Sequence, residues 1–132
     1  DKKQARKNMR LGYYDALRLL YGLKGKWYYL DAPESEAYYF ERLIGETDIL
    51  KGLIPWETLA GLKELQEKEG GYRIYTERIF PELAKQWKMK EGWDYKELYL
   101  SILENGARSR RIGRFHVYTP GELLAEIRKK LI

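Results

Sequence analysis

Residues 119–131 read Thr-Pro-Gly-Glu-Leu-Leu-Ala-Glu-Ile-Arg-Lys-Lys-Leu. The first four form a capping box, because the side chains of Thr119 and Glu122 can each accept a hydrogen bond from a free amide at a helix start, and Pro120 suits the first helical position. Apolar residues then recur at helical spacing. The stretch therefore predicts a final helix that begins at Thr119 or Pro120.

Similar signals lie upstream. Helices are predicted over 4–23, from the capping sequence at 31–34 to about 44, from Pro55 to about 70, over 77–89, and from the capping box at 94–97 to about 104, where Asn105-Gly106 is a strong stop signal. Short strands are predicted at 26–30, 72–75 and 108–118. The fold class is mainly α with minor β content: one domain over 1–132, a compact bundle of about six short helices with two or three short strands. The chain is either complete in itself or a module of a larger protein or assembly.

Composition excludes several classes of function. The 132 residues contain no cysteine, which rules out disulfides, zinc fingers and thiol catalysis and suits a reducing, cytoplasmic location. No apolar run approaches the roughly 20 residues of a membrane span, so no membrane partner is expected. Charged residues make up 34% of the chain while Asn, Gln and Met are scarce, a bias typical of thermophiles. We therefore expect melting above the mesophile range of about 45–65 °C.

The charges are segregated along the chain. Residues 1–26 carry eight Lys/Arg against two acids, residues 27–70 carry four against ten, and residues 107–132 carry seven against two. Two basic ends around an acidic middle indicate a polarised molecule, and the basic ends favour a polyanionic partner. The acidic segment 31–69 is a candidate surface for a basic protein partner.

The strongest candidate site is the basic run at 108–118. Arginine suits phosphate because its planar guanidinium donates two parallel hydrogen bonds. The neighbouring rings offer flat faces on which bases can stack. The same run also fits a solvated edge guarded by charge. The residues expected to bind nucleic acid here are Arg108, Arg110, Arg111, Arg114, Phe115, His116 and Tyr118.

A second basic cluster lies on the first predicted helix. Lys3, Lys7 and Arg10 share one helical face and Arg6 lies beside it, while Ala5, Met9, Tyr13, Leu17 and Leu20 form an apolar stripe. The basic face suits phosphate contacts, although a solvated chain end has the same composition. The two clusters would form one surface if the chain ends pack together.

Aromatic residues are abundant, with twelve Tyr, four Trp and three Phe, and most are expected in the core or at its rim. Neighbouring strand residues point to opposite faces, so one of Tyr28 and Tyr29 is expected to be exposed. An exposed ring near arginine is a platform for base stacking.

Signals of catalysis are weak. The chain has one histidine, His116, and no Walker or Rossmann motif, so we assign no catalytic residue, metal or cofactor. We therefore predict a non-enzymatic domain that binds single-stranded DNA or RNA through arginine–phosphate contacts and stacking, with little sequence specificity. One alternative is an accessory subunit of a replication or RNA-processing assembly. A more distant one is a metal-independent ribonuclease that uses His116.

Overall fold

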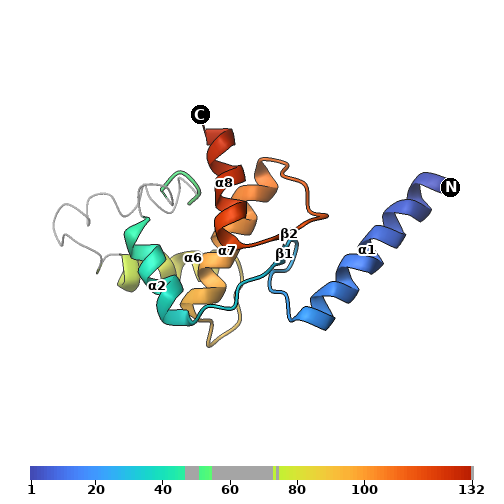
Figure 1. The fold of residues 1–132 in the computed structure, drawn as a ribbon. Coiled ribbons are helices and arrows are strands. Elements are labelled where there is room, and N and C mark those ends of the chain that lie inside the picture. The colour runs from blue at the N-terminus through green and yellow to red at the C-terminus, as the bar shows by residue number, and fades with distance from the viewer. Residues whose placement is uncertain (47–50, 55–72, 74, 132) are drawn as a thin grey trace. The chain divides into compact units, whose positions relative to one another are not determined.

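The computed structural model describes residues 1–46, 51–54, 73 and 75–131. This part of the chain is mostly helical and includes five α-helices and one two-stranded sheet, which confirms the mainly α prediction (Figure 1). The contacts divide the chain into two units, one formed by Asp1–Pro33 with Leu103–Ile132 and the other by Glu34–Ile102. The single domain stays a prediction. The elements are α1 (Lys2–Tyr21), β1 (Tyr29–Leu30), α2 (Glu36–Gly45), the π-helical turn η1 (Tyr75–Ile79), α6 (Phe80–Gln86), α7 (Tyr95–Ser109), β2 (Val117–Tyr118) and α8 (Pro120–Leu131).

Helix α1 begins and ends close to its predicted limits. The Asp1 side chain accepts a hydrogen bond from the Gln4 amide at its start. Gly22 ends it in the left-handed conformation, at φ 62°, and donates its amide to the Arg18 carbonyl. Glycine adopts this conformation without steric cost, which makes it a common helix terminator. None of the residues of α1 is buried.

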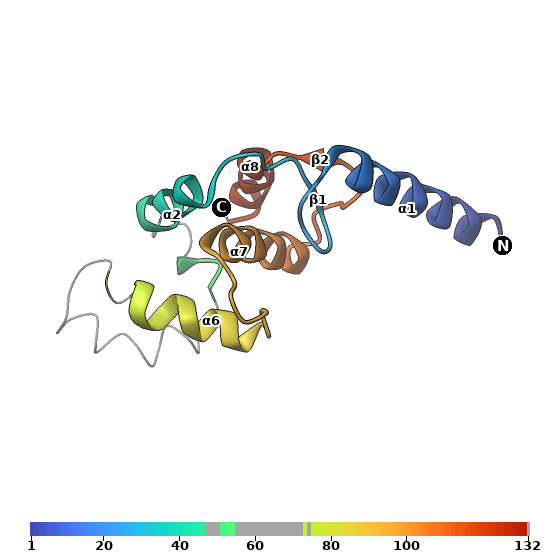
Figure 2. The same ribbon diagram turned by 90° about the horizontal axis from the view of Figure 1, so that it is seen from below.

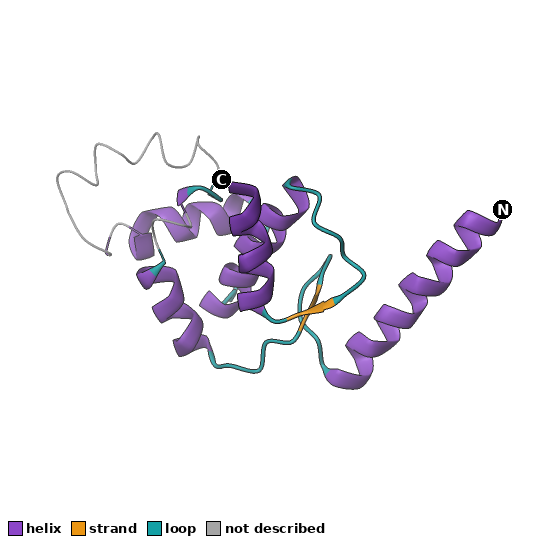
Figure 3. Ribbon diagram, turned by 45° about the horizontal axis from the view of Figure 1, so that its top comes forward, coloured by secondary structure: helices purple, strands orange, loops and turns teal. Residues whose placement is uncertain are grey.

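The two strands pair in parallel, with Tyr29 opposite Val117 and Leu30 opposite Tyr118 (Figures 2 and 3). The Asp31 amide donates to the Tyr118 carbonyl and extends the pairing by one bond. Each strand is shorter than predicted. Only this short stretch of the 108–118 run is extended, because α7 occupies its first residues and turns follow.

The predicted stop at Asn105-Gly106 is wrong, because α7 continues to Ser109. Gly106 and Ala107 are buried there. Burial of this last turn outweighs the cost of a glycine in a helix, which is only about 1 kcal/mol relative to alanine. The helix ends where Arg111 adopts a positive φ of 57°. Its start is as predicted, since the Asp94 carboxylate accepts a hydrogen bond from the Glu97 amide at 2.7 Å.

The capping box of α8 is confirmed. The Glu122 amide donates to the Thr119 hydroxyl oxygen at 3.1 Å, and the Thr119 amide donates to the Glu122 carboxylate at 3.3 Å. The apolar face that follows is buried through Leu123 and Ile127. Local capping and core burial therefore agree on where this helix lies.

In the second unit the helix boundaries move from their predicted positions. Helix α2 starts at Glu36, one residue after its cap Ser35, because Asp31 is instead bonded to β2. The predicted helix over 77–89 is divided into η1 and α6, and it ends before Lys88, whose φ is 52°. Tyr75 is the first residue of η1, whereas the sequence predicted it as the last residue of a strand at 72–75. The predicted helix from Pro55 to about 70 lies outside the described residues.

The expectation that one of Tyr28 and Tyr29 is exposed is wrong, because both have 0% exposure. The Tyr28 hydroxyl donates to the Ile112 carbonyl at 2.6 Å. The Tyr29 hydroxyl donates to Asp15 of α1 at 2.9 Å. Neighbouring side chains do point to opposite faces of a strand. Here the chain covers both faces, so alternation does not imply exposure.

Candidate nucleic-acid interface

A buried carboxylate holds the turn that precedes β1. Glu104 of α7 is 7% exposed and accepts hydrogen bonds from the backbone amides of Lys26, Trp27 and Tyr28, at 2.7–3.0 Å. Hydrogen bonds to an ionised acceptor are among the strong ones in proteins. Gly25 permits the turn, because its φ is 96° and a Cβ there would lie 2.6 Å from the Tyr28 carbonyl oxygen. The turn therefore has one fixed geometry.

This turn carries Trp27, and two arginines lie over its ring. The guanidinium carbon of Arg108 lies 4.3 Å from the centre of the Trp27 ring, and that of Arg114 lies 4.0 Å from it. Both distances are well within the range of cation–π attraction. Arg114 is also fixed by two hydrogen bonds, from Nε to the Trp27 carbonyl at 3.1 Å and from Nη2 to the Tyr29 hydroxyl at 3.4 Å.

The alternation of cation and ring continues to the first helix. Arg114 lies 5.5 Å from the Phe115 ring centre, and Arg10 of α1 lies 5.3 Å from it. Phe115 also contacts Tyr14 of α1, with ring centres 5.5 Å apart. We call the five alternating residues the cation–ring ladder: Arg10, Phe115, Arg114, Trp27 and Arg108. It joins the two basic clusters of the sequence, which are about a hundred residues apart along the chain.

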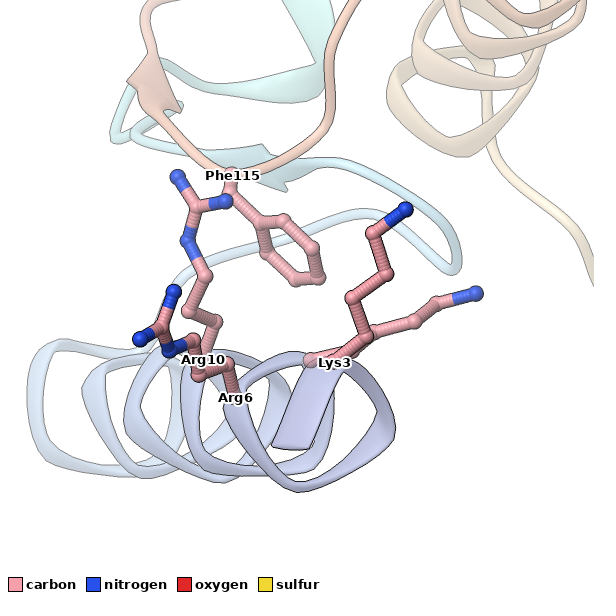
Figure 4. Close-up of a pocket in the computed structure, with 5 residues that line it drawn as sticks. Lys3, Arg6, Arg10 and Phe115 are labelled. Atoms are coloured by element: carbon pink, nitrogen blue, oxygen red, sulfur yellow. The ribbon is translucent and has the colours of Figure 1, made fainter. Parts of the chain in front are cut away.

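One end of the ladder borders a groove. Its volume is about 380 Å³, and it is lined by Phe115 and the four cations Lys3, Arg6, Lys7 and Arg10. The Phe115 ring points from its loop towards α1, and the side chains of Lys3 and Arg10 extend from the helix on either side of it (Figure 4). A single aromatic face among four cations can stack a planar base and contact its phosphates.

The charges of the groove are not balanced within the described residues. The five ion pairs found there involve none of Lys3, Arg6, Lys7 and Arg10. The three ladder arginines lie over rings instead of beside carboxylates. Cations gathered without acids repel each other, and a polyanion relieves this repulsion.

The other predicted residues have local structural contacts. Arg110 donates to the Gly106 carbonyl at 3.0 Å and so caps the end of α7. Arg111 is exposed in its left-handed turn. The His116 ring packs on Tyr118, with centres 4.6 Å apart, and its Nε2 lies 3.9 Å from Glu122. Tyr118 is buried and donates its hydroxyl to the Gly113 carbonyl at 2.7 Å. These residues flank the ladder without belonging to it.

Sequence reasoning assigned no specific role to Trp27 or Glu104. The available signal was Gly25 two residues before a tryptophan, since such a glycine marks a tight turn that can present a ring. Nothing in the sequence pairs this turn with Glu104, which is 76–78 residues away.

No known family model, characterised protein or solved structure matches this chain. Among the described residues, no group of three or more histidine, aspartate or glutamate side chains is placed to hold a metal ion. None of the helices described is both long enough and apolar enough to cross a bilayer.

Proposed function

We propose that this protein binds single-stranded nucleic acid, with little sequence specificity, along the cation–ring ladder and the adjoining groove. Lys3, Lys7 and Arg10 contact phosphates, and Phe115 and Trp27 offer faces to unpaired bases. Stacking tolerates any base because every base has a π-face, and the cations read the backbone alone.

The observation that supports this proposal most strongly is the joining of the two basic clusters. Arg10 and Phe115 come from opposite ends of the sequence, and the guanidinium carbon of Arg10 lies 5.3 Å from the centre of the Phe115 ring. They lie beside a groove lined by four cations, none of which takes part in the ion pairs found among the described residues. A solvated helix end would leave its cations scattered around its circumference. Cations that converge on an aromatic ring suit a ligand that is both anionic and planar.

The rival hypotheses gain less from the geometry. His116 does not line the groove and packs against Tyr118, so nothing adds to the ribonuclease alternative. About half of the acidic segment 31–69, on which an accessory role would depend, lies outside the described residues.

Fluorescence anisotropy with labelled single-stranded RNA, single-stranded DNA and duplex DNA tests the proposal. We expect the single strands to bind more tightly than the duplex. The affinity should fall steeply with salt, because bound phosphates release their counterions. The double variant Lys3→Ala/Lys7→Ala should bind more weakly and lose about one unit of salt slope per lost phosphate contact.

The matched control is Lys129→Ala/Lys130→Ala, which removes the same charge from the exposed end of α8. Equal loss of affinity in both double variants would mean that binding depends only on the net charge of the protein, and it would overturn the assignment of the groove as the binding site. Absence of salt-dependent binding to any of the three probes would overturn the proposed function itself.

A further inference from the structure

Most of the apolar stripe of α1 is exposed, although Leu17 is half-buried. Met9 is 75% exposed, Tyr13 61% and Leu20 77%. At 3.6 residues per turn these three side chains follow one line along the helix, with Gly12 and Ala16 between them and Ala5 about one turn before Met9. Lys3 and Lys7 project from the other side, where the groove is. Large apolar side chains gathered on one surface mark an interaction site.

Gly12 adds an independent observation. It lies in the middle of α1 and is not among the residues with positive φ, so the backbone does not require glycine. A Cβ placed there would meet no atom within 4 Å, so the packing of the chain does not require it either. Glycine weakens a helix relative to alanine. A close approach by another backbone at this point is the physical use that remains for it.

We infer that the stripe binds a second copy of this chain, through an antiparallel pairing of two α1 helices. This inference goes beyond the proposed function and does not depend on it. The pattern of the stripe identifies the partner, because two copies of the stripe are complementary to each other when they run antiparallel.

The fit follows from the spacing of large and small residues. If two antiparallel helices cross between residues 12 and 13, Met9 of one copy lies level with Ala16 of the other. Leu20 lies level with Ala5, and Tyr13 with Gly12. Each large side chain then meets a small one, which permits the interdigitated packing of close helix pairs.

Charge selects the same orientation. The first ten residues of the chain contain five cations and one acid, whereas residues 11–21 contain Asp15 and Arg18 and are neutral overall. Parallel pairing would place the two cationic halves side by side. Antiparallel pairing places each cationic half against a neutral half and so avoids this repulsion.

The exposed apolar area supplies a substantial part of what a dimer interface needs. Leu19, beside the stripe, is also largely exposed, which gives four large apolar side chains on or beside this face. A single aromatic side chain can bury about 150–250 Å². Together the four offer several hundred Å², which is a substantial part of the roughly 800 Å² that each partner contributes to an interface of standard size.

Light scattering coupled to size-exclusion chromatography, over a wide range of protein concentration, tests the pairing. We expect a mass of twice 15.8 kDa at high concentration. Met9→Glu should raise the dimer dissociation constant at least about tenfold, as loss of a central apolar contact does. The control is Asn8→Glu, which adds the same charge at the neighbouring exposed position, off the stripe. A monomer at every concentration, or equal effects of the two variants, overturns the inference.

Gly12→Leu separates folding from pairing. The position is open in the single chain, so helix content by circular dichroism should be kept or increased. The dimer should nevertheless weaken, because the added side chain occupies the space of the partner's Tyr13. An undiminished dimer in this variant contradicts the close approach.

Orientation has its own test, since the chain has no cysteine. Under mild oxidation, a mixture of Met9→Cys and Ala16→Cys proteins should form a mixed disulfide, because these positions are level in the antiparallel pair. Each variant alone should cross-link poorly. Efficient cross-linking of Met9→Cys with itself would support a parallel pair and overturn the proposed register.

Discussion

The protein contains two regions rich in aromatic rings, and they differ in what the rings are paired with. In the cation–ring ladder, Arg108 and Arg114 lie over Trp27, and no carboxylate pairs with them among the described residues. In the second unit, the Tyr39 hydroxyl donates to Glu34 at 2.6 Å and the Tyr99 hydroxyl donates to Glu46 at 2.9 Å. We call these last four residues the tyrosine–carboxylate cluster.

The contrast shows that aromatic content alone indicates no function. The rings of the cluster are buried and their hydroxyls are satisfied by acids, so the region stabilises its own unit. Its arginine is also balanced, because Arg42 pairs with Glu46 at 3.2 Å. The ladder has the opposite electrostatic character, with unbalanced cations beside rings that keep some exposure. Of the two regions, only the cation–ring ladder has positive charge that an anionic ligand could neutralise.

The largest expected effect comes from Glu104→Ala, which removes the support of the ladder. The variant leaves the amides of Lys26, Trp27 and Tyr28 without their acceptor, and of these bonds only that of Tyr28 is fully buried. An unsatisfied buried donor costs about 1–3 kcal/mol, and a partly exposed one costs less because water can replace the acceptor. We expect a loss of about 2–3 kcal/mol in the free energy of unfolding, measured by urea denaturation. Glu82→Ala, at an exposed position of α6, is the control and should change the stability little. A small effect of Glu104→Ala would mean that the turn does not depend on this carboxylate.

Alkaline pH should destabilise both units through their buried tyrosines. Burial, with the neighbouring carboxylate, raises the pKa values of Tyr39 and Tyr99 above the usual 10, and burial raises the pKa of Tyr28 to about 12. Their contribution to stability is complete below pH 10, where both folded and unfolded chains are protonated. It is lost as the pH rises from 10 through the folded-state values.

Absorbance of tyrosinate at 295 nm and denaturation at each pH check this expectation. The stability should decline progressively above pH 10, and the buried tyrosines should titrate later than the exposed ones. Constant stability up to pH 12 would contradict the burial of these hydroxyls.

Trp27→Ala and Tyr38→Ala test the ladder against its counterpart in the second unit. Each ring has an arginine over it, Arg114 at 4.0 Å from Trp27 and Arg42 at 5.5 Å from Tyr38. If the ladder stacks bases, Trp27→Ala should weaken binding of single-stranded RNA or DNA by about 1–3 kcal/mol. Tyr38→Ala should leave the affinity unchanged. Equal losses in anisotropy titrations would remove the functional distinction between the two regions.

The smallest effects concern the helix caps of the two units. Thr119→Ala should lower the free energy of unfolding by about 1 kcal/mol, because it removes the acceptor of the Glu122 amide at 3.1 Å. Ser35→Ala should cost less, since the Tyr38 amide lies 3.5 Å from the Ser35 hydroxyl oxygen, at the limit of a hydrogen bond. Thermal denaturation of both variants shows which substitution lowers the stability more. A larger loss of stability for Ser35→Ala than for Thr119→Ala would contradict this prediction.

Much of the local structure could be predicted. The capping boxes at Asp94 and Thr119 and the helix end at Gly22 are where the sequence placed them. The stop at Asn105-Gly106 and the exposure of a tyrosine at 28–29 were wrong. Both errors come from tertiary packing, which buries Gly106 within α7 and covers both faces of β1.

The sequence by itself determined the mainly α fold, the basic face of α1 and its apolar stripe. These features depend on residues at most four positions apart, whose geometry follows from helical periodicity and capping. Tertiary structure alone decided that Arg10 meets Phe115, that Arg108 and Arg114 lie over Trp27, and that Glu104 holds the turn that carries Trp27. The partners in these contacts are 76 or more residues apart, so no local propensity brings them together. Their meeting depends on the pairing of β1 with β2 and on the burial of the Glu104 carboxylate among backbone amides.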